Sequence, residues 1–168
     1  MLRKCRQDET PQMLGIINAA AEAYRGVIPA DCWHEPYMAA AELAAELRAG
    51  VEFWGYERDG ALVGVMGTQA VRDVELIRHA YVAPAWQGHG VGTALIARLR
   101  ALAVRPMLVG TWAAATWAIR LYERHGFELT DPQVSRRLLA SYWRISERQM
   151  ETSVVLADRA AAGLQSRA

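Results

Sequence analysis

A loop with glycine at every second position, Gly88, Gly90 and Gly92, constrains this chain more than any other feature of its sequence. Residues 74–82 before the loop, which are apolar at their C-terminal end, are typical of a strand, and residues 94–104 after it carry apolar side chains at helical spacing. Glycine lets a backbone approach a ligand closely, and the first N–H groups of a helix have no partner within the helix. These N–H groups and the helix dipole attract an anion. The order strand, glycine loop, helix therefore predicts a phosphate-binding cradle and a phosphorylated cofactor.

The spacing of the glycines narrows the choice of cofactor. A Rossmann dinucleotide site requires a third glycine at position 93, which is Thr93 here. A nucleotide P-loop requires a lysine in the loop, and the single lysine of this chain is Lys4. ATP and NAD therefore fit poorly, although a nucleotide-binding domain and a glycine-rich turn without a ligand stay as alternatives.

Two blocks of sequence resemble signatures of one enzyme family. Residues 87–92, Gln-Gly-His-Gly-Val-Gly, match the pattern Gln/Arg-x-x-Gly-x-Gly/Ala, and they follow a strand that ends in Val-x-Pro. Residues 117–127 are similar to the pattern Ala-x-x-Phe/Leu-Tyr-x-x-x-Gly-Phe, and a predicted helix and strand separate the two blocks. Together they resemble the acetyl-CoA site of the GNAT N-acetyltransferase superfamily. The resemblance extends over residues 1–157 and implies acetyl-CoA (coenzyme A) as the cofactor.

Composition and charge are those of an ordinary globular protein. The 168 residues are 52% apolar and 22% charged, and the net charge is +1. No charge excess indicates a nucleic acid or a membrane surface as partner, no apolar run approaches the ~20 residues that cross a bilayer, and no apolar signal core follows Met1. We therefore expect a cytoplasmic protein with one domain over residues 1–157 and a frayed tail over residues 158–168. The distant Cys5 and Cys32 predict reduced thiols and no metal site.

The hydrophobic pattern predicts the element order βααβββαβαββ. An Asp-Gly turn at residues 59–60 marks a hairpin between residues 51–57 and 61–69, and residues 149–157 alternate as a last strand. Residues 136–143 have the spacing of a further short helix. The pattern and the resemblance together imply an α+β or mixed α/β fold, with a GNAT-like central mixed β-sheet of about six to seven strands and about four helices on both faces.

The resemblance assigns cofactor contacts residue by residue. The strand before the loop would pair with the amide-rich pantetheine arm through Tyr81 and Val82. Arg124 lies where a basic side chain could reach the 3′-phosphate of the cofactor, although a solvated helix face is the simpler explanation. Relatives often carry asparagine where this chain has Ala115, so one contact to the arm is in doubt. The expected cofactor-binding residues are Tyr81, Val82, Gln87, Gly88, His89, Gly90, Val91, Gly92, Thr93, Ala118 and Arg124.

Three residues are candidates for the chemistry. Tyr122 matches the tyrosine that acts in the family as general acid beside the cofactor sulfur, and a phenol with an ordinary pKa near ~10 can protonate a thiolate. Glu75 and His79 are the candidate bases, because charged groups are rarely placed in a central strand without a partner or purpose. Alternation puts Glu75, His79 and Tyr81 on one face and Arg78 on the other, unless a bulge shifts the strand. The alternatives are an internal ion pair that only holds the sheet, or no dedicated base.

The acceptor would bind opposite the cofactor, between the first two helices and the loop before the last strand. Tyr24, Trp33, Glu35 and Trp143 stand in those segments, where rings and acids could hold a cationic amine. An aromatic core seam is the alternative explanation for these residues. We therefore expect an acetyl-CoA-dependent N-acetyltransferase that acts on a small-molecule or peptide primary amine by direct attack in a ternary complex, because neither cysteine lies in a motif. The second hypothesis is a catalytically weak acyl-CoA-binding or regulatory module, and a homodimer stays open.

Overall fold

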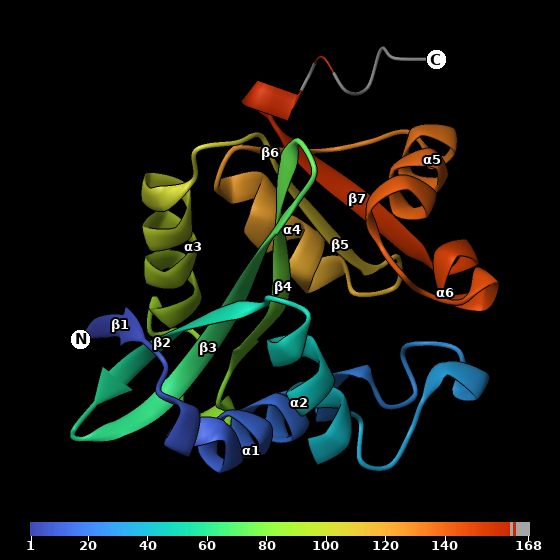
Figure 1. Cartoon of the computed structure of the whole chain (residues 1–168). Helices are drawn as coiled ribbons and strands as arrows, with labels where there is room; N and C mark the ends of the chain where they lie inside the picture. The colour runs from blue at the N-terminus through green and yellow to red at the C-terminus, as the bar shows by residue number, and fades with distance from the viewer. Residues whose placement is uncertain (162, 164–168) are drawn as a thin grey trace.

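The structure is a computed structural model that describes residues 1–161 and 163. In this part of the chain, seven strands form one sheet in the order β1-β2-β3-β4-β5-β7-β6 (Figure 1). β4 and β5 are parallel, and the other neighbouring strands of the described sheet are antiparallel. The strands are β1 (Leu2–Lys4), β2 (Glu52–Arg58), β3 (Ala61–Val71), β4 (Val74–Val82), β5 (Met107–Trp112), β6 (Phe127–Leu129) and β7 (Ser153–Asp158). The helices are α1 (Thr10–Ala21), α2 (Ala40–Arg48), α3 (Val91–Leu102), α4 (Thr116–Arg124), α5 (Pro132–Tyr142) and α6 (Glu147–Glu151).

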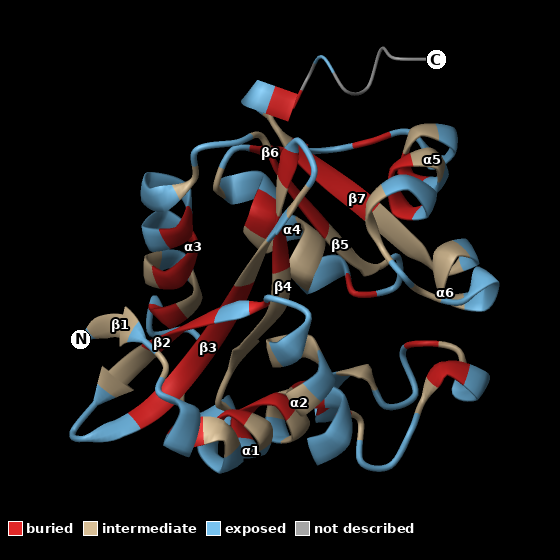
Figure 2. Ribbon diagram, in the orientation of Figure 1, coloured by how far each residue is buried: buried red, intermediate tan, exposed pale blue. Residues whose placement is uncertain are grey.

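Helices cover both faces of the sheet, as the sequence predicts. On one face, α3 and α4 pack against a buried cluster that includes Ile77 of β4 and Val109 of β5. On the other face, α1 and α2 pack over β2 and β3, and α5 packs over Leu76 and Leu108 of the central strands. Alternation along β4 and β5 places these two sets of contacts on opposite sides. The burial colours show the resulting pattern, with buried strands between helices that are buried along one side (Figure 2).

Two predictions about the C-terminal part need correction. The region predicted as a strand over residues 149–157 begins as the helix α6, and β7 starts only at Ser153. The Ser146 side chain accepts a hydrogen bond from the backbone N–H of Gln149, which is the N-cap arrangement that starts a helix. The described chain therefore has six α-helices where the sequence predicts about four, and the predicted short helix over residues 136–143 is the longer α5.

β4 contains a bulge that changes which side chains share a face. Tyr81 pairs with Val65 and Arg78 with Gly67, so His79 and Ala80 oppose a single residue of β3. His79 has φ of 51°, a left-handed backbone conformation that is uncommon for a residue other than glycine. After the bulge, each side chain of β4 points to the face opposite to the one that regular alternation would give it.

The predicted common face for Glu75, His79 and Tyr81 is therefore wrong. Glu75 precedes the bulge and shares the face of Ile77, whereas Tyr81 packs edge-on against Tyr24 on the α1 side. His79 lies 3.2 Å from a carboxylate oxygen of α2, on the side to which Arg78 also points. The physical reason is the bulge, which the residue types of the strand do not predict.

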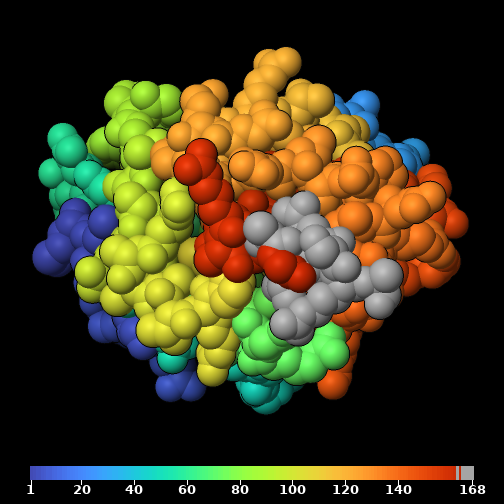
Figure 3. All heavy atoms as spheres, turned by 90° about the horizontal axis from the view of Figure 1, so that it is seen from above, coloured from blue at the N-terminus to red at the C-terminus, as the bar shows by residue number. Residues whose placement is uncertain are grey.

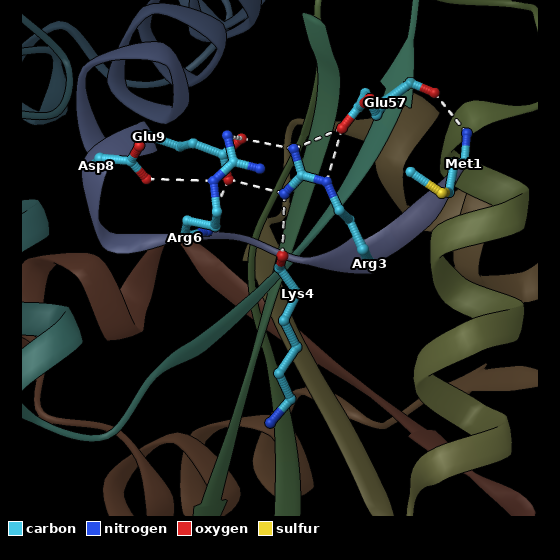
Figure 4. A network of polar contacts seen from close by, with 7 residues as sticks. All are labelled: Met1, Arg3, Lys4, Arg6, Asp8, Glu9 and Glu57. Carbon is cyan, nitrogen blue, oxygen red and sulfur yellow. Dashed lines mark hydrogen bonds and ion pairs between the residues drawn. The ribbon is translucent and has the colours of Figure 1, made fainter. Parts of the chain in front are cut away.

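Charged side chains fasten the N-terminal segment to the first hairpin (Figure 4). The Arg3 guanidinium donates to both oxygens of Glu9, at 2.9 and 2.6 Å, and to Glu57 of β2 at 2.7 Å. Glu9 is only 3% exposed, and its carboxylate also accepts from the backbone N–H of Arg6 at 2.6 Å. Hydrogen bonds from Arg3 and from the Arg6 backbone hold the pKa of Glu9 at about 2. The carboxylate therefore stays charged in the folded protein.

At one end of the sheet, the β3–β4 turn, α3 and α5 surround the end of β7 (Figure 3). The opposite end carries the carboxyl ends of β4 and β5 and the loop 87–93. None of the helices in the described residues is long and apolar enough to cross a membrane.

Candidate active site

A cavity lies between β4 and β5, where the two parallel strands part. Their pairing ends at Ile77 and Val109, and beyond these residues the two strands are no longer paired. The cavity has a volume of about 760 Å³. It is lined by the ends of both strands, by the loop 87–93, by α4, by residues around Tyr24 after α1, and by the segment 143–149. Sequence elements from both halves of the chain therefore meet at this one hollow.

The glycine loop presents open backbone to the cavity. Gly88 and Gly90 have φ of 77° and 78°, and a Cβ built at either position meets no atom within 4 Å. Within the described chain, the N–H groups of residues 88–93 donate no backbone hydrogen bond, because α3 makes its first such bond from Ala94. Gln87 ties the loop to the strand before it, since its side-chain amide donates to the backbone carbonyl of Val82 at 3.1 Å. The loop therefore has the unpaired donors that a phosphate group needs.

The remaining loop residues differ in what they can offer. Val91 is buried in the core, and a Cβ at Gly92 would lie at an ordinary contact distance, 3.6 Å, from the side chain of Leu121 of α4. The side chain of Thr93 borders the cavity. His89 does not border it, since its ring packs edge-on against Trp86 and its Nδ1 lies 2.9 Å from the Gln87 carbonyl. A cofactor contact by His89 would thus come from its backbone.

α4 brings Tyr122 to the cavity. The side chain is 4% exposed and packs edge-on against Phe127, with ring centroids 5.9 Å apart. Burial, with a smaller contribution from Tyr24, raises the pKa of Tyr122 above its ordinary value of 10. The phenol is therefore protonated throughout the neutral range and is able to donate a hydrogen bond or a proton. Ala118 and Arg124 of the same helix also line the cavity.

Ala115, which stands where relatives often carry asparagine, is fully buried immediately before α4. Its methyl group can donate no hydrogen bond to a cofactor arm. The neighbouring Thr116 side chain is exposed and does not border the cavity. A direct side-chain substitute for the asparagine is therefore not found at these two positions.

His79 and Arg78 both border the cavity at the bulge of β4 and meet the same carboxylate behind it. Glu46 of α2 lies 3.2 Å from Nε2 of His79 and 2.8 Å from a guanidinium nitrogen of Arg78. The contact with His79 is the largest cause of a lowered pKa for Glu46, so this group is a carboxylate at neutral pH. Nε2 of His79 is buried and, among the described residues, has no hydrogen-bond partner that meets the geometric criteria, so the carboxylate of Glu46 is its nearest charged neighbour. Glu46 was not among the residues singled out from the sequence.

Glu75, the other candidate base, stands apart from the cavity. Its side chain does not border the hollow, and Oε1 lies 3.3 Å from the hydroxyl of Thr68 on β3. Oε2 is buried, and the structure gives it no hydrogen-bond partner. The structure therefore brings His79, and not Glu75, together with Tyr122.

Four aromatic residues that line the cavity pack against one another. The Tyr24 ring lies 5.8 Å from that of Trp117 in a stacked arrangement and 5.4 Å from that of Tyr37. Tyr81 packs edge-on against both tyrosines, and burial raises its pKa well above 10. Tyr24 was expected at the acceptor site, and Tyr81 was expected only to contact the cofactor. Tyr37 lies in a segment that the sequence assigned to the acceptor side, whereas Trp117 was expected only as part of the apolar stripe of its helix.

Two predicted acceptor residues, Trp33 and Glu35, do not border the cavity. Both are held by Arg25, whose guanidinium lies 4.6 Å from the Trp33 ring centroid and 2.6 Å from a carboxylate oxygen of Glu35. Trp143 does border it, and its indole lies flat on β5 at Gly110, where a Cβ would approach the ring to 3.3 Å. Only Tyr24 and Trp143 of the four predicted acceptor residues therefore line the hollow.

Comparison with protein families identifies the chain. The model of the GNAT acetyltransferase domain matches residues 49–129, which include β4, the glycine loop, α3, β5 and α4. The chain belongs to the GNAT superfamily. The matched range includes the cavity-lining residues of β4, the glycine loop, β5 and α4. A comparison with curated protein sequences finds no match.

Solved GNAT structures share this fold. Ribosomal-protein-alanine N-acetyltransferase from Brucella melitensis is 25% identical with a TM-score of 0.61, over 78% of this chain and 86% of that one. PaiA N-acetyltransferase from Thermoplasma acidophilum, in complex with coenzyme A, is 13% identical with a TM-score of 0.71, over 94% and 97%. A GNAT family acetyltransferase from Elizabethkingia anophelis with acetyl-CoA bound is 17% identical with a TM-score of 0.65, over 94% and 96%. The predicted GNAT-like mixed sheet is confirmed.

Proposed function

We propose that this GNAT protein is an acetyl-CoA-dependent N-acetyltransferase that acts on a primary amine by direct attack. The continuity of the cavity carries this proposal, because one hollow joins the glycine loop, the diverging end of β4 and Tyr122. A cofactor with phosphates at one end and a reactive thioester at the other fits such an arrangement. Two of the similar solved structures hold coenzyme A or acetyl-CoA, which supports the choice of cofactor.

The residues that would hold acetyl-CoA are those of the loop and of β4. The free N–H groups of residues 88–93 suit its pyrophosphate, and the strand end at Tyr81 and Val82, with no β5 neighbour, suits the amides of its arm. Arg124 supplies a positive charge on the same wall. Once bound, acetyl-CoA supplies an activated acetyl group as a thioester. The chain's own task is then to hold the amine and to move protons.

Tyr122 and His79 are the groups proposed for those proton movements. Tyr122 would protonate the departing sulfur, and His79 would take a proton from the attacking amine directly or through water. Cys5 and Cys32 do not border the cavity, in keeping with direct attack by the amine and not with transfer through a cysteine. His79 is a better placed base than Glu75, which lies outside the hollow.

A module that binds acyl-CoA with little catalysis is the second candidate. One observation favours it: among the described residues, no Asp or Glu lines the cavity. His79 would therefore be the proposed base without a carboxylate beside it on the cavity wall. Its distinguishing property would be acetyl-CoA binding without thiol release in the presence of amines.

Calorimetric titration with acetyl-CoA, with ATP and NAD as controls, tests the proposal first. We expect micromolar binding of acetyl-CoA and none of either control, followed by release of free thiol when an accepted amine is added. Binding without thiol release across primary amines of varied size and charge would favour the second candidate. Binding of ATP or NAD in place of acetyl-CoA would overturn the assignment of the glycine loop.

A further inference from the structure

The acceptor end of the cavity offers flat aromatic surface. Tyr24 lies between Tyr37, Tyr81 and Trp117, with ring centroids 5.4, 6.3 and 5.8 Å away, and all four residues line the hollow. Trp112 of β5 fixes one of these rings, because its indole N–H donates to the Tyr37 hydroxyl at 2.9 Å. Ring faces attract apolar and aromatic groups, and they also attract an ammonium group. The surface is thus suited to an amine attached to a flat apolar body.

The charge of the cavity wall argues against an acceptor with several positive charges. Its charged or titratable cationic side chains are Arg78, His79 and Arg124, and none of the lining side chains in the described chain is Asp or Glu. Glu46, behind the wall, is already engaged by Arg78 and His79. A polyamine or a lysine-rich peptide would therefore bring charges into a site without free counter-charges, which is costly.

Hydrogen bonds and an ion pair also connect the segments around the cavity. Asp31, in the loop before α2, accepts from Arg148 of α6 at 2.8 and 3.2 Å, and this ion pair spans two segments that border the cavity. Asn18 of α1 holds the backbone of Met38 through both its amide oxygen and its amide nitrogen, at 2.8 and 3.0 Å. The hollow of about 760 Å³ has to accommodate the cofactor arm as well as the acceptor.

From these observations we infer that the acceptor is a small primary monoamine with a flat aromatic body, of the arylalkylamine class. The inference rests on the proposed function and adds the substrate to it. The aromatic body lies among Tyr24, Tyr37 and Trp117, and the ammonium group meets ring faces before it is deprotonated. The amine loses one proton before attack and a second as its nitrogen bonds to the acetyl carbon. The carbon–sulfur bond breaks, sulfur takes up one proton as a free thiol, and one proton is released overall.

Acceptor specificity tests this inference directly. We would compare kcat/KM, followed by thiol release, for 2-phenylethylamine, 2-cyclohexylethylamine, spermidine and a tetrapeptide that begins with alanine. We expect the value for 2-phenylethylamine to exceed that for its cyclohexyl analogue by three-fold or more, and those for spermidine and the peptide by ten-fold or more. An equal or higher value for any of the other three acceptors would overturn the inference.

A titration with acetyl-CoA, in the same preparations, separates failure of this inference from failure of the proposed function. If acetyl-CoA binds and spermidine or the peptide is the preferred acceptor, the acetyltransferase proposal stands and the aromatic acceptor is wrong. If acetyl-CoA binds and no amine releases thiol, the aromatic acceptor is wrong and the acyl-CoA-binding module is favoured. If acetyl-CoA does not bind, the proposed function fails, and the inference fails with it.

Variants of Tyr24 test whether the ring sets the preference. We expect Tyr24→Leu to lower the ratio of kcat/KM for 2-phenylethylamine over spermidine about five-fold, and Tyr24→Phe, which keeps the ring, to retain that ratio. The affinity for acetyl-CoA reports whether each variant is folded. If Tyr24→Leu does not fold, Trp117→Leu serves in its place, because Trp117 is 43% exposed. Unchanged ratios in the leucine variant would contradict the inference.

Discussion

The Tyr122 hydroxyl is the group on which turnover should depend most directly. Replacing it with phenylalanine keeps the packing against Phe127 but removes the proton donor. We expect Tyr122→Phe to lower kcat ten-fold or more, because general acid catalysis typically contributes about 10²–10⁴-fold. The dissociation constant for acetyl-CoA should change by less than about two-fold, since the ring is kept. Steady-state kinetics and calorimetry measure the two quantities, and a variant with wild-type turnover would exclude Tyr122 as the acid.

A side chain at Gly90 should weaken acetyl-CoA binding while the protein still folds. Its φ is 78° and its missing Cβ faces open space, so Gly90→Val places a branched side chain where the phosphates are proposed to lie. We expect at least a 100-fold loss of acetyl-CoA affinity in calorimetry.

Gly60 provides a matched control for the backbone strain of that substitution. It has φ of 79° and equally open space, and it lies in the β2–β3 turn away from the cavity. Gly60→Val should therefore suffer a similar loss of stability but bind acetyl-CoA as the wild type does. Equal affinities of the two variants for acetyl-CoA would refute the proposal that the glycine loop binds the phosphates.

At the scale of elements, the bulge in β4 depends on a glycine in the neighbouring strand. A Cβ on Gly67 would lie 2.9 Å from the carbonyl oxygen of Arg78 and 2.8 Å from a side-chain carbon of Val51. Backbone atoms cannot move aside as a flexible side chain can, so the strand at His79 would have to shift. We expect Gly67→Ala to lower the free energy of unfolding by about 1–3 kcal/mol. Urea denaturation measures this value.

Gly15→Ala is the control for the loss of glycine flexibility, since a Cβ at Gly15 of α1 meets nothing within 4 Å. This variant should be as stable as the wild type or more so, by up to about 1 kcal/mol, because alanine favours a helix. If Gly67→Ala behaved like Gly15→Ala, the proposed dependence of the bulge on Gly67 would be wrong.

The ties between the N-terminal segment and the first hairpin predict a pH dependence of stability. The pKa of Glu9 is about 2 in the folded protein, below its ordinary value of 4.5. A lowered folded-state pKa stabilises above the unfolded value, and this stabilisation is lost as the pH falls from about 4.5 towards 2. We therefore expect Glu9→Gln to cost about 1–3 kcal/mol at pH 7 and progressively less below pH 4.5. Urea denaturation across this pH range provides the measurement.

Glu52→Gln serves as the comparison for that series. Glu52 pairs with Lys4 at 2.7 Å, but both side chains are more than half exposed. Exposed ion pairs contribute about 0–1 kcal/mol, so this variant should differ little from the wild type at any pH. A Glu9→Gln penalty that stayed constant down to pH 2 would contradict the assigned role of the Arg3–Glu9 pair.

Over the whole molecule, sequence patterns predicted the regular elements and the cavity lining from the glycine loop and α4 better than the lining that comes from distant segments. The glycine loop and the α4 block are contiguous in sequence, so their local chemistry can be read directly. The faces of His79 and Tyr81 relative to Glu75 could not be read, because they depend on a bulge where β3 pairs with β4. Tyr24, Trp117 and Trp143 line the cavity but come from distant segments of the chain. No single stretch of sequence therefore predicts that they lie close together.

The strand order has a consequence for synthesis of the chain. β7 leaves the ribosome after the other six strands of the described sheet, yet it lies between β5 and β6. Strands nearer the N-terminus leave the ribosome earlier, although a domain generally folds as a unit. β1 to β4 can therefore pair in the order of their synthesis, whereas β5 and β6 must wait with exposed edges until residues 153–158 arrive. The half of the molecule that carries the indole of Trp143 and the helix of Tyr122 is completed last, so a ribosome that stalls before this strand leaves behind an unfinished hollow and two unpaired edges.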